Sequence, residues 1–312
     1  MFISYAQNFE DVMLNRLFGD RNEGFYIDVG AHHPYYDSVT KAFYDRGWRG
    51  INIEPVKQYF DLLQQERTQD INLNFALGQT ASELTFYELE DTGLSSFDRE
   101  PVQAIADQDN YQVLTYQVPV KTLADICQEY ATQQIDFLKV DVEGWEEQVL
   151  LGNNWQKFRP IIILLEATIP NSPVKVKTNI PQLLIKQNYE HVYFDGLNDY
   201  YLAKEHSKLK SHFATPPNVF DRFISARLHE KEQELHILNN KYKDQFYEVK
   251  RLTQHLKEQQ QSKQTKTNLS SAEVLELQTQ LNEARQLVMA METSKFWKMR
   301  SAWFKLKRIL AR

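Results

Sequence analysis

Three short apolar runs in this sequence each lead directly into an acidic residue. The acids are Asp28, Glu54 and Asp141. In an open α/β sheet, ligands bind outside the carboxyl ends of the parallel strands. If the three runs are strands, their carboxylates should therefore gather around one crevice. A single acid at a strand end can equally be a polar residue placed where the strand meets solvent, so the prediction depends on all three together.

The first acid is followed by a glycine turn, Gly30, and a helix-length segment separates that turn from the strand ending at Glu54. Strand, turn, helix and strand in this order predict a β-α-β unit that binds a nucleotide. The turn continues as A-H-H-P (residues 31–34), so the G-x-G-x-x-G pyrophosphate fingerprint is missing. This disfavours a nicotinamide dinucleotide. S-adenosylmethionine has no pyrophosphate, and its ribose hydroxyls would suit the Glu54 carboxylate.

Methyl transfer from that cofactor to a hydroxyl requires alignment and a proton acceptor. The candidate bases are His32, His33, Asp141 and Glu143. An imidazole with an ordinary pKa near ~6.5 suits the task at neutral pH, but His33 can simply shape the loop and Glu143 can cap the next helix. We expect Asp141 at the site ahead of either histidine as the base. No full set of metal ligands is visible, so no metal site is predicted, although a divalent ion between Asp141 and Glu143 stays open.

The elements that position these residues follow from hydrophobic spacing and turn residues. We expect helices at 5–18, 39–46, 56–65, 122–130, 145–151 and 182–186, the second capped by Ser38. Strands are expected at 25–27, 51–53, 71–76, 135–141 and 161–165, and a closing hairpin pairs 191–194 with 200–203. Residues 83–121 break the β-α alternation and predict a hairpin insertion, whose loop Gly93–Phe97 could cover a substrate site.

The composition limits the class of protein and the compartment. The chain has 312 residues and a net charge of −6, but residues 294–312 hold seven basic residues and no acid, which leaves −13 for the rest. An acidic body argues against a nucleic-acid surface. The single Cys127 excludes an intrachain disulfide and fits a reducing compartment. Neither an export signal nor an apolar run of the ~18–20 residues that span a bilayer is visible, so we expect a cytoplasmic protein.

The last ninety residues contain neither Gly nor Pro and predict helix. Apolar residues recur every seven positions from Leu228 to Leu256, and the run resumes out of phase after a polar break at 260–271. This favours a coiled-coil arm that joins copies of the chain, or else a solvated helical stalk. Residues 294–312 form a basic amphipathic pattern that suits a membrane surface, an acidic partner or another subunit. A peripheral membrane contact is therefore one expectation for this segment.

Several blocks of the sequence resemble the FkbM-type family of class I methyltransferases. They are Y-I-D-V-G-A (26–31), G-W-R-G-I-N-I-E-P (47–55), A-L-G (76–78), V-K-T-L (120–123) and I-D-F-L-K-V-D-V-E-G (135–144), with R-P (159–160) and Glu166 downstream. The resemblance covers about residues 4–205. It implies S-adenosylmethionine as the cofactor and transfer of its methyl group to an oxygen, commonly a hydroxyl of a sugar or a secondary metabolite.

The resemblance also implies roles for individual residues. Cofactor binding falls to Asp28, Gly30 and Ala31 near the methionine end, to Glu54 and Pro55 at the ribose, to Ala76 and Leu77 by the adenine, and to Asp141, which with Glu143 faces the reacting centre. The two histidines replace further glycines that many methyltransferases carry in the first loop.

Together these observations predict a Rossmann-like α/β methyltransferase domain at 1–225, with a mostly parallel sheet and a closing antiparallel hairpin. A helical arm at 226–293 and a basic helix at 294–312 would follow. The predicted function is S-adenosylmethionine-dependent O-methylation of a sugar, glycan or related metabolite. The alternative is a catalytically inactive scaffold with the same fold, assembled by its coiled coil. The joint presence of Asp28, Glu54 and Asp141 favours the enzyme.

Overall fold

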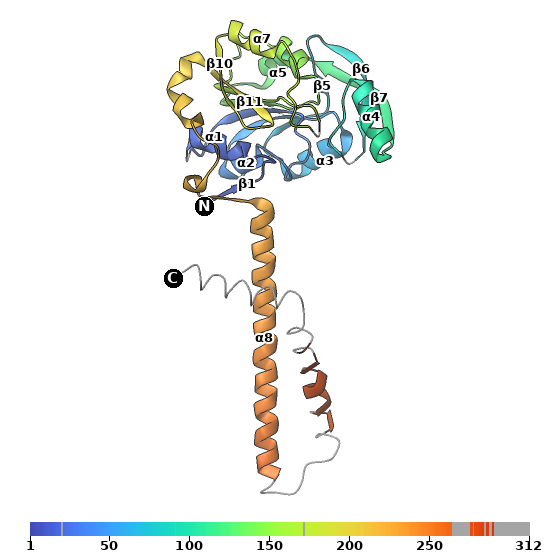
Figure 1. Ribbon diagram of the computed structural model, residues 1–312, viewed down its shortest axis with the longest axis vertical. Coiled ribbons are helices and arrows are strands. Elements are labelled where there is room, and N and C mark those ends of the chain that lie inside the picture. The colour runs from blue at the N-terminus through green and yellow to red at the C-terminus, as the bar shows by residue number, and fades with distance from the viewer. Residues whose placement is uncertain are drawn as a thin grey trace. The chain divides into compact units, whose positions relative to one another are not determined.

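The computed structural model describes residues 1–19, 21–90, 92–170 and 172–263, with short stretches between 275 and 289 (Figure 1). The chain divides into two compact units. The first is Met1–His229, and the second begins at Glu230. All the described strands lie in the first unit, which also holds the candidate site.

Seven strands form the central sheet in the order β10-β11-β9-β8-β2-β3-β4. Five of them are parallel: β2 (Phe25–Val29), β3 (Arg49–Ile53), β4 (Ile71–Leu73), β8 (Phe137–Val140) and β9 (Ile162–Glu166). The hairpin of β10 (Tyr189–Phe194) and β11 (Asn198–Ala203) closes one edge, with β11 antiparallel to both neighbours. The mostly parallel sheet and its closing hairpin are thus confirmed.

Alternation along the strands assigns side chains to the two faces of the sheet. In β2, Tyr26 joins one buried cluster, whereas Ile27 joins the other. The face that holds Tyr26 packs against α1 (Glu10–Phe18) and α2 (Lys41–Arg46). The opposite face packs against α5 (Leu123–Tyr130), α6 (Glu146–Leu151) and α7 (Ile180–Lys186). Helices on both faces bury most residues of the parallel strands, which explains their largely apolar runs.

The parallel strands end at a common level. Val29 at the end of β2 pairs with Ile53 of β3 and with Val140 of β8, which in turn pairs with Leu165 of β9. From β2 the chain proceeds outward to β3 and β4, and it later returns on the other side of β2 to form β8 and β9. The strand order therefore reverses between β2 and β8, and ligands of open α/β sheets bind at such a switch point.

A second sheet carries the predicted insertion. β6 (Ser82–Leu89) and β7 (Val113–Lys121) form the expected antiparallel pair, and β5 (Ala76–Leu77) adds a parallel strand. The connection contains a helix that was not predicted, α4 (Arg99–Asp109), whose few apolar residues pack on the hairpin through Val102 and Ala106. The expected single strand 71–76 is divided between the two sheets. At the division, the Asn74 side chain donates 2.9 Å hydrogen bonds to the carbonyls of Glu54 and Pro55.

Three predicted helix starts are wrong, among them that of α7, which begins at Ile180 and not at residue 182. The first helix begins at Glu10 rather than residue 5, because Ser4, Tyr5 and Ala6 donate hydrogen bonds to the Asp11 carboxylate instead of continuing the helix. Residues 2–4 form the short strand β1 (Phe2–Ser4), which pairs with β12 (Phe223–Ser225). The second predicted helix begins at Lys41 rather than residue 39, and its N-cap is Thr40 rather than Ser38.

The remaining elements include α3 (Lys57–Glu66) and two 3-10 segments, η1 (Lys204–Phe213) and η2 (Val219–Asp221). The helix α8 (Ala226–Lys263) continues through residues 260–263, where a polar break was expected to begin. Coiled-coil pairing stays a prediction, and residues 294–312 lie outside the described part of the chain. Among the described helices, none is long and apolar enough to cross a membrane.

Candidate active site

A cavity of about 350 Å³ lies at the carboxyl ends of the central strands. Its walls come from the segments that follow β2, β3, β8 and β9, and from the loop of the insertion. Of the residues predicted for the site, Gly30, Ala31, His32, Glu54, Pro55, Ala76, Leu77, Asp141 and Glu143 line the cavity. Asp28 and His33 do not.

Gly30 directly follows β2 and lies against the backbone at the end of β8, at the switch point. Its φ is +73°, and a Cβ at this position would lie 1.8 Å from the backbone oxygen of Asp141. Any other residue would therefore overlap the main chain of the neighbouring strand end, so the ends of β2 and β8 approach this closely only because residue 30 is glycine.

Asp28 lies behind the cavity wall, with 1% of its surface exposed. It is paired in register with Lys139 of β8, whose ammonium lies 3.2 Å from the Asp28 carboxylate and 3.4 Å from that of Asp141. The same ammonium donates a 2.6 Å hydrogen bond to the Gly30 carbonyl. Burial alone would lower the pKa of Lys139, but the two carboxylates outweigh it and raise the pKa above its ordinary value. Lys139 is therefore charged and ties both strand ends together.

Glu54 is 4% exposed and is held by main-chain donors. Its Oε2 accepts a 2.8 Å bond from the N–H of His32, and its Oε1 accepts a 2.8 Å bond from the N–H of Val56. Burial raises its pKa to about 7, against the lowering effect of these N–H groups. Each oxygen keeps one further lone pair, which is what two adjacent ribose hydroxyls need.

The two histidines of the first loop have different environments. His33 Nδ1 accepts 3.0 Å bonds from the N–H groups of Tyr35 and Tyr36, so this side chain shapes the turn. His32 lines the cavity, and its ring centroid lies 3.8 Å from that of Tyr59. Burial, with the nearby Lys139 charge, lowers the pKa of His32 to about 4. The His32 ring is therefore neutral at pH 7.

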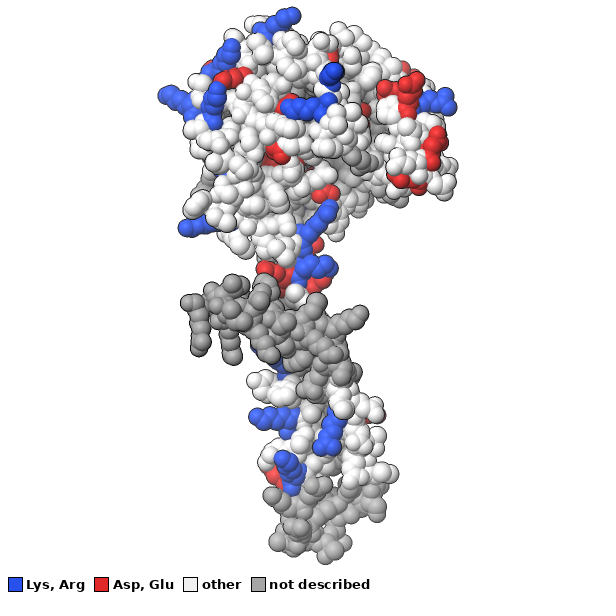
Figure 2. Space-filling view, in the orientation of Figure 1, with Lys and Arg blue, Asp and Glu red and all other residues white. Residues whose placement is uncertain are grey.

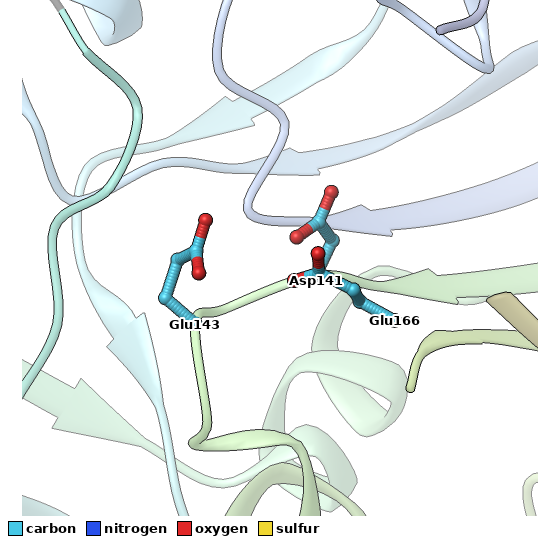
Figure 3. Close-up of side chains that lie close together, drawn as sticks. All are labelled: Asp141, Glu143 and Glu166. Atoms are coloured by element: carbon cyan, nitrogen blue, oxygen red, sulfur yellow. The ribbon is translucent and has the colours of Figure 1, made fainter. Parts of the chain in front are cut away.

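Three carboxyl groups meet at the ends of β8 and β9, on the side of the cavity away from Glu54. Asp141, Glu143 and Glu166 each offer an oxygen within 4.8 Å of the others. Figure 3 shows Asp141 and Glu166 converging, with the Glu143 carboxyl extending toward the same space from the turn after β8. We call these three residues the acidic cluster. Such a set suits a divalent cation or shared protons.

Like charges at this separation oppose ionisation of the acidic cluster. Burial, followed by the charge of Asp141, raises the pKa of Glu143 to about 8. Burial and the charges of Asp141 and Glu143 raise the pKa of Glu166 to about 10. Protons therefore remain on this side of the cavity at neutral pH.

Aromatic side chains and the insertion loop complete the wall near Ala76 and Leu77. Trp145 and Phe97 lie 5.2 Å apart between ring centroids, and Phe97 also packs on Phe86 at 5.1 Å. All three line the cavity. The predicted covering loop does border the cavity, through Thr92, Gly93, Leu94, Ser95 and Phe97.

A scan against protein-family models matches residues 28–200 to the methyltransferase FkbM domain. The match covers more than half of the chain and contains the strand-end acids and the acidic cluster. The chain belongs to the FkbM methyltransferase family. A search of curated proteins finds no match.

The FkbM match confirms the resemblance seen in the sequence and supports a methyltransferase in general terms. Two cavity residues of this FkbM domain were missed as site residues, Lys139 and Glu166. Each carried a signal, because Lys139 interrupts an apolar strand and Glu166 is a fourth strand-end acid. Ser96, whose hydroxyl contacts the backbone of Glu143, had no local signal in the sequence.

Proposed function

We propose that the protein is an S-adenosylmethionine-dependent O-methyltransferase that acts on a hydroxyl of a sugar, a glycan or a related metabolite. The proposal rests on one observation: a single cavity at the β2/β8 switch point has Glu54 on one side and the acidic cluster on the other. Glu54 lies at the end of β3 with lone pairs to spare, and the acidic cluster lies at the ends of β8 and β9. The choice of a sugar acceptor follows the tendency of the family.

The residues present fit the proposed cofactor. When bound, S-adenosylmethionine supplies an activated methyl group on a positively charged sulfonium. Glu54 would hold the ribose hydroxyls, and Ala76 and Leu77 would border the adenine. The acidic cluster would face the positive charge, which favours ionised carboxylates at short range.

The acceptor hydroxyl needs a group that takes its proton, and we assign this role to Asp141. Its side chain is 40% exposed and borders the cavity, and Lys139 fixes its position. His32 also borders the cavity and, with a neutral ring at pH 7, is the alternative base. We expect Asp141→Asn to reduce transfer by about 10²–10⁴-fold, the usual range for removal of a general base.

Cofactor binding tests the proposal directly. Calorimetry of the full chain should show binding of S-adenosylmethionine, and Glu54→Ala should weaken it by about 10–100-fold, because hydrogen bonds to a charged group contribute ~1.5–3 kcal/mol. Glu83→Ala is the matched control, since Glu83 is an exposed glutamate of β6 that does not line the cavity. If the full chain does not bind S-adenosylmethionine, the inactive scaffold becomes the better description.

The acceptor can be sought by measuring S-adenosylhomocysteine release against uncharged glycans and nucleotide sugars. On the face shown in Figure 2, basic and acidic side chains are interspersed, and acids gather over the insertion around α4. The described residues on that face form no continuous basic patch for a nucleic acid.

We also propose that the arm joins copies of the chain. In support, heptad positions of α8 such as Leu228 and Leu235 are 53% and 44% exposed. Light scattering of the full chain tests this, and a monomer mass would refute it.

A further inference from the structure

The turn after β8 holds Glu143 in an unusual backbone conformation. Glu143 has φ +50° and the following Gly144 has φ +91°. The left-handed region costs a non-glycine residue about 1–2 kcal/mol, so surrounding contacts must hold it. The backbone conformation also fixes the direction of the Cα–Cβ bond. It therefore decides whether the Glu143 carboxyl reaches Asp141 and Glu166.

Two side chains hold this turn. Glu146 accepts 3.1 Å bonds from the N–H groups of Val142 and Gly144, which lie on either side of Glu143. The remaining contact comes from a different part of the fold. Ser96, in the insertion loop and 3% exposed, donates a 2.8 Å hydrogen bond from its hydroxyl to the Glu143 carbonyl.

Ser96 is itself fixed on the insertion. It exchanges two backbone hydrogen bonds with Tyr87 of β6, at 3.0 and 3.1 Å. The next residue, Phe97, packs on Trp145 just beyond the turn. The hydroxyl is thus presented to Glu143 by a paired segment and does not depend on a free loop for its position.

We propose that Ser96 is a positioning residue, which holds the Glu143 carboxyl within the acidic cluster and so couples the insertion to the reacting centre. This inference rests on the proposed function, since it takes the cluster to face the sulfonium. Without the hydroxyl, the turn can relax toward right-handed backbone and carry the carboxyl away from Asp141 and Glu166. Its ionisation would then no longer respond to the charge of the bound cofactor.

The test compares Ser96→Thr with Ser96→Val in the full chain. Both add the same volume at a buried site, but only threonine keeps the hydroxyl. The readout is the affinity for S-adenosylmethionine divided by that for S-adenosylhomocysteine, measured by calorimetry from pH 6 to pH 9. The two ligands share every titrating group and differ in the sulfonium charge, so the ratio reports the carboxyls that face this charge.

In the wild type the ratio should rise about tenfold with pH, with its midpoint near the pKa of Glu143, because a nearby cation typically shifts a carboxyl pKa by at least ~1 unit. Ser96→Thr should keep this rise, and Ser96→Val should reduce it to threefold or less. Glu143→Gln should reduce it likewise. Ser4→Val is the control, since it removes a buried hydroxyl bonded to Asp11, outside the cavity.

Coincident profiles for Ser96→Thr and Ser96→Val would overturn the role of Ser96. A wild-type ratio that does not vary with pH would show that Glu143 does not face the sulfonium, and would overturn the inference as well. Failure of the wild type to bind either ligand is a separate result that rejects the proposed function itself.

Discussion

The acids on the two sides of the cavity differ in what surrounds them. Asp28 and Glu54, beside β2 and β3, face donors: an ammonium and the Thr40 hydroxyl for Asp28, and two main-chain N–H groups for Glu54. The acidic cluster, beside β8 and β9, mostly faces its own members. Within the described part of the chain, Asp141 is the one member of the cluster with an ion-pair partner, the shared Lys139.

This difference suits two kinds of task. An acid with fixed donors keeps its position whether or not a ligand is present, which is what recognition of a neutral diol requires. Acids that crowd one another hold protons and release them when a positive charge arrives. The same cavity therefore combines a pre-organised side with a side whose ionisation depends on the ligand.

Removal of Lys139 should destabilise the side of the cavity that is rich in donors, and it should have the largest effect on the free energy of unfolding. Lys139→Met keeps an unbranched side chain but leaves the buried Asp28 without a cation. We expect the free energy of unfolding to fall by about 3–5 kcal/mol, as when one partner of a buried ion pair is removed. Urea denaturation measures this change.

Lys57→Met provides the matched comparison, because Lys57 pairs with Asp61 on the surface with 69% of its side chain exposed. It should cost less than about 1 kcal/mol. The double variant Lys139→Met with Asp28→Asn should recover part of the loss, since no buried charge is then left unpaired. Equal losses for the two lysine variants would mean that Lys139 does not stabilise the strand ends.

Much of the central sheet could be predicted from the sequence. Apolar runs that end in acids predicted the strands, and the rule that parallel strands end together predicted that Glu54 and Asp141 border one cavity. The rule could not tell which acids are exposed there. Asp28 precedes the last residue of β2 and lies on the same face of the sheet as Tyr26. Its side chain therefore contacts Lys139, its partner in β8, and does not line the cavity.

The parts that could not be predicted depend on register and on distant contacts. Glu166 joins the cluster because Leu165 of β9 pairs with Val140 of β8, and this alignment is not written in either strand. Ser96 contacts Glu143 across 47 residues of sequence. Helix α4 was missed because its Val102 and Ala106 pack on the hairpin of the insertion and not on the main sheet.

The acidic cluster predicts a smaller effect of opposite sign, which appears as a pH dependence of stability. Glu143 has a folded-state pKa of about 8, above the ordinary value of 4.5. The folded state therefore binds more protons than the unfolded state across this interval, and the free energy of unfolding falls as pH rises from about 4.5 to 8. Glu10, at about 8, and Glu54, at about 7, add to the same trend.

Glu143→Gln should remove one part of this slope. At pH 8 the variant should be more stable than the wild type by ~1–2 kcal/mol, allowing for partial exposure, and at pH 5 the two should be nearly equal, because Glu143 is then protonated in the folded state. Glu83→Gln, at an exposed position, should leave the slope unchanged. Urea denaturation at both pH values decides the matter. Destabilisation of the fold by Glu143→Gln at pH 8, as expected for Lys139→Met, would contradict this prediction. It would mean that a partner such as a bound cation stabilises the charges of the acidic cluster. The two sides of the cavity would then not differ in their need for a partner.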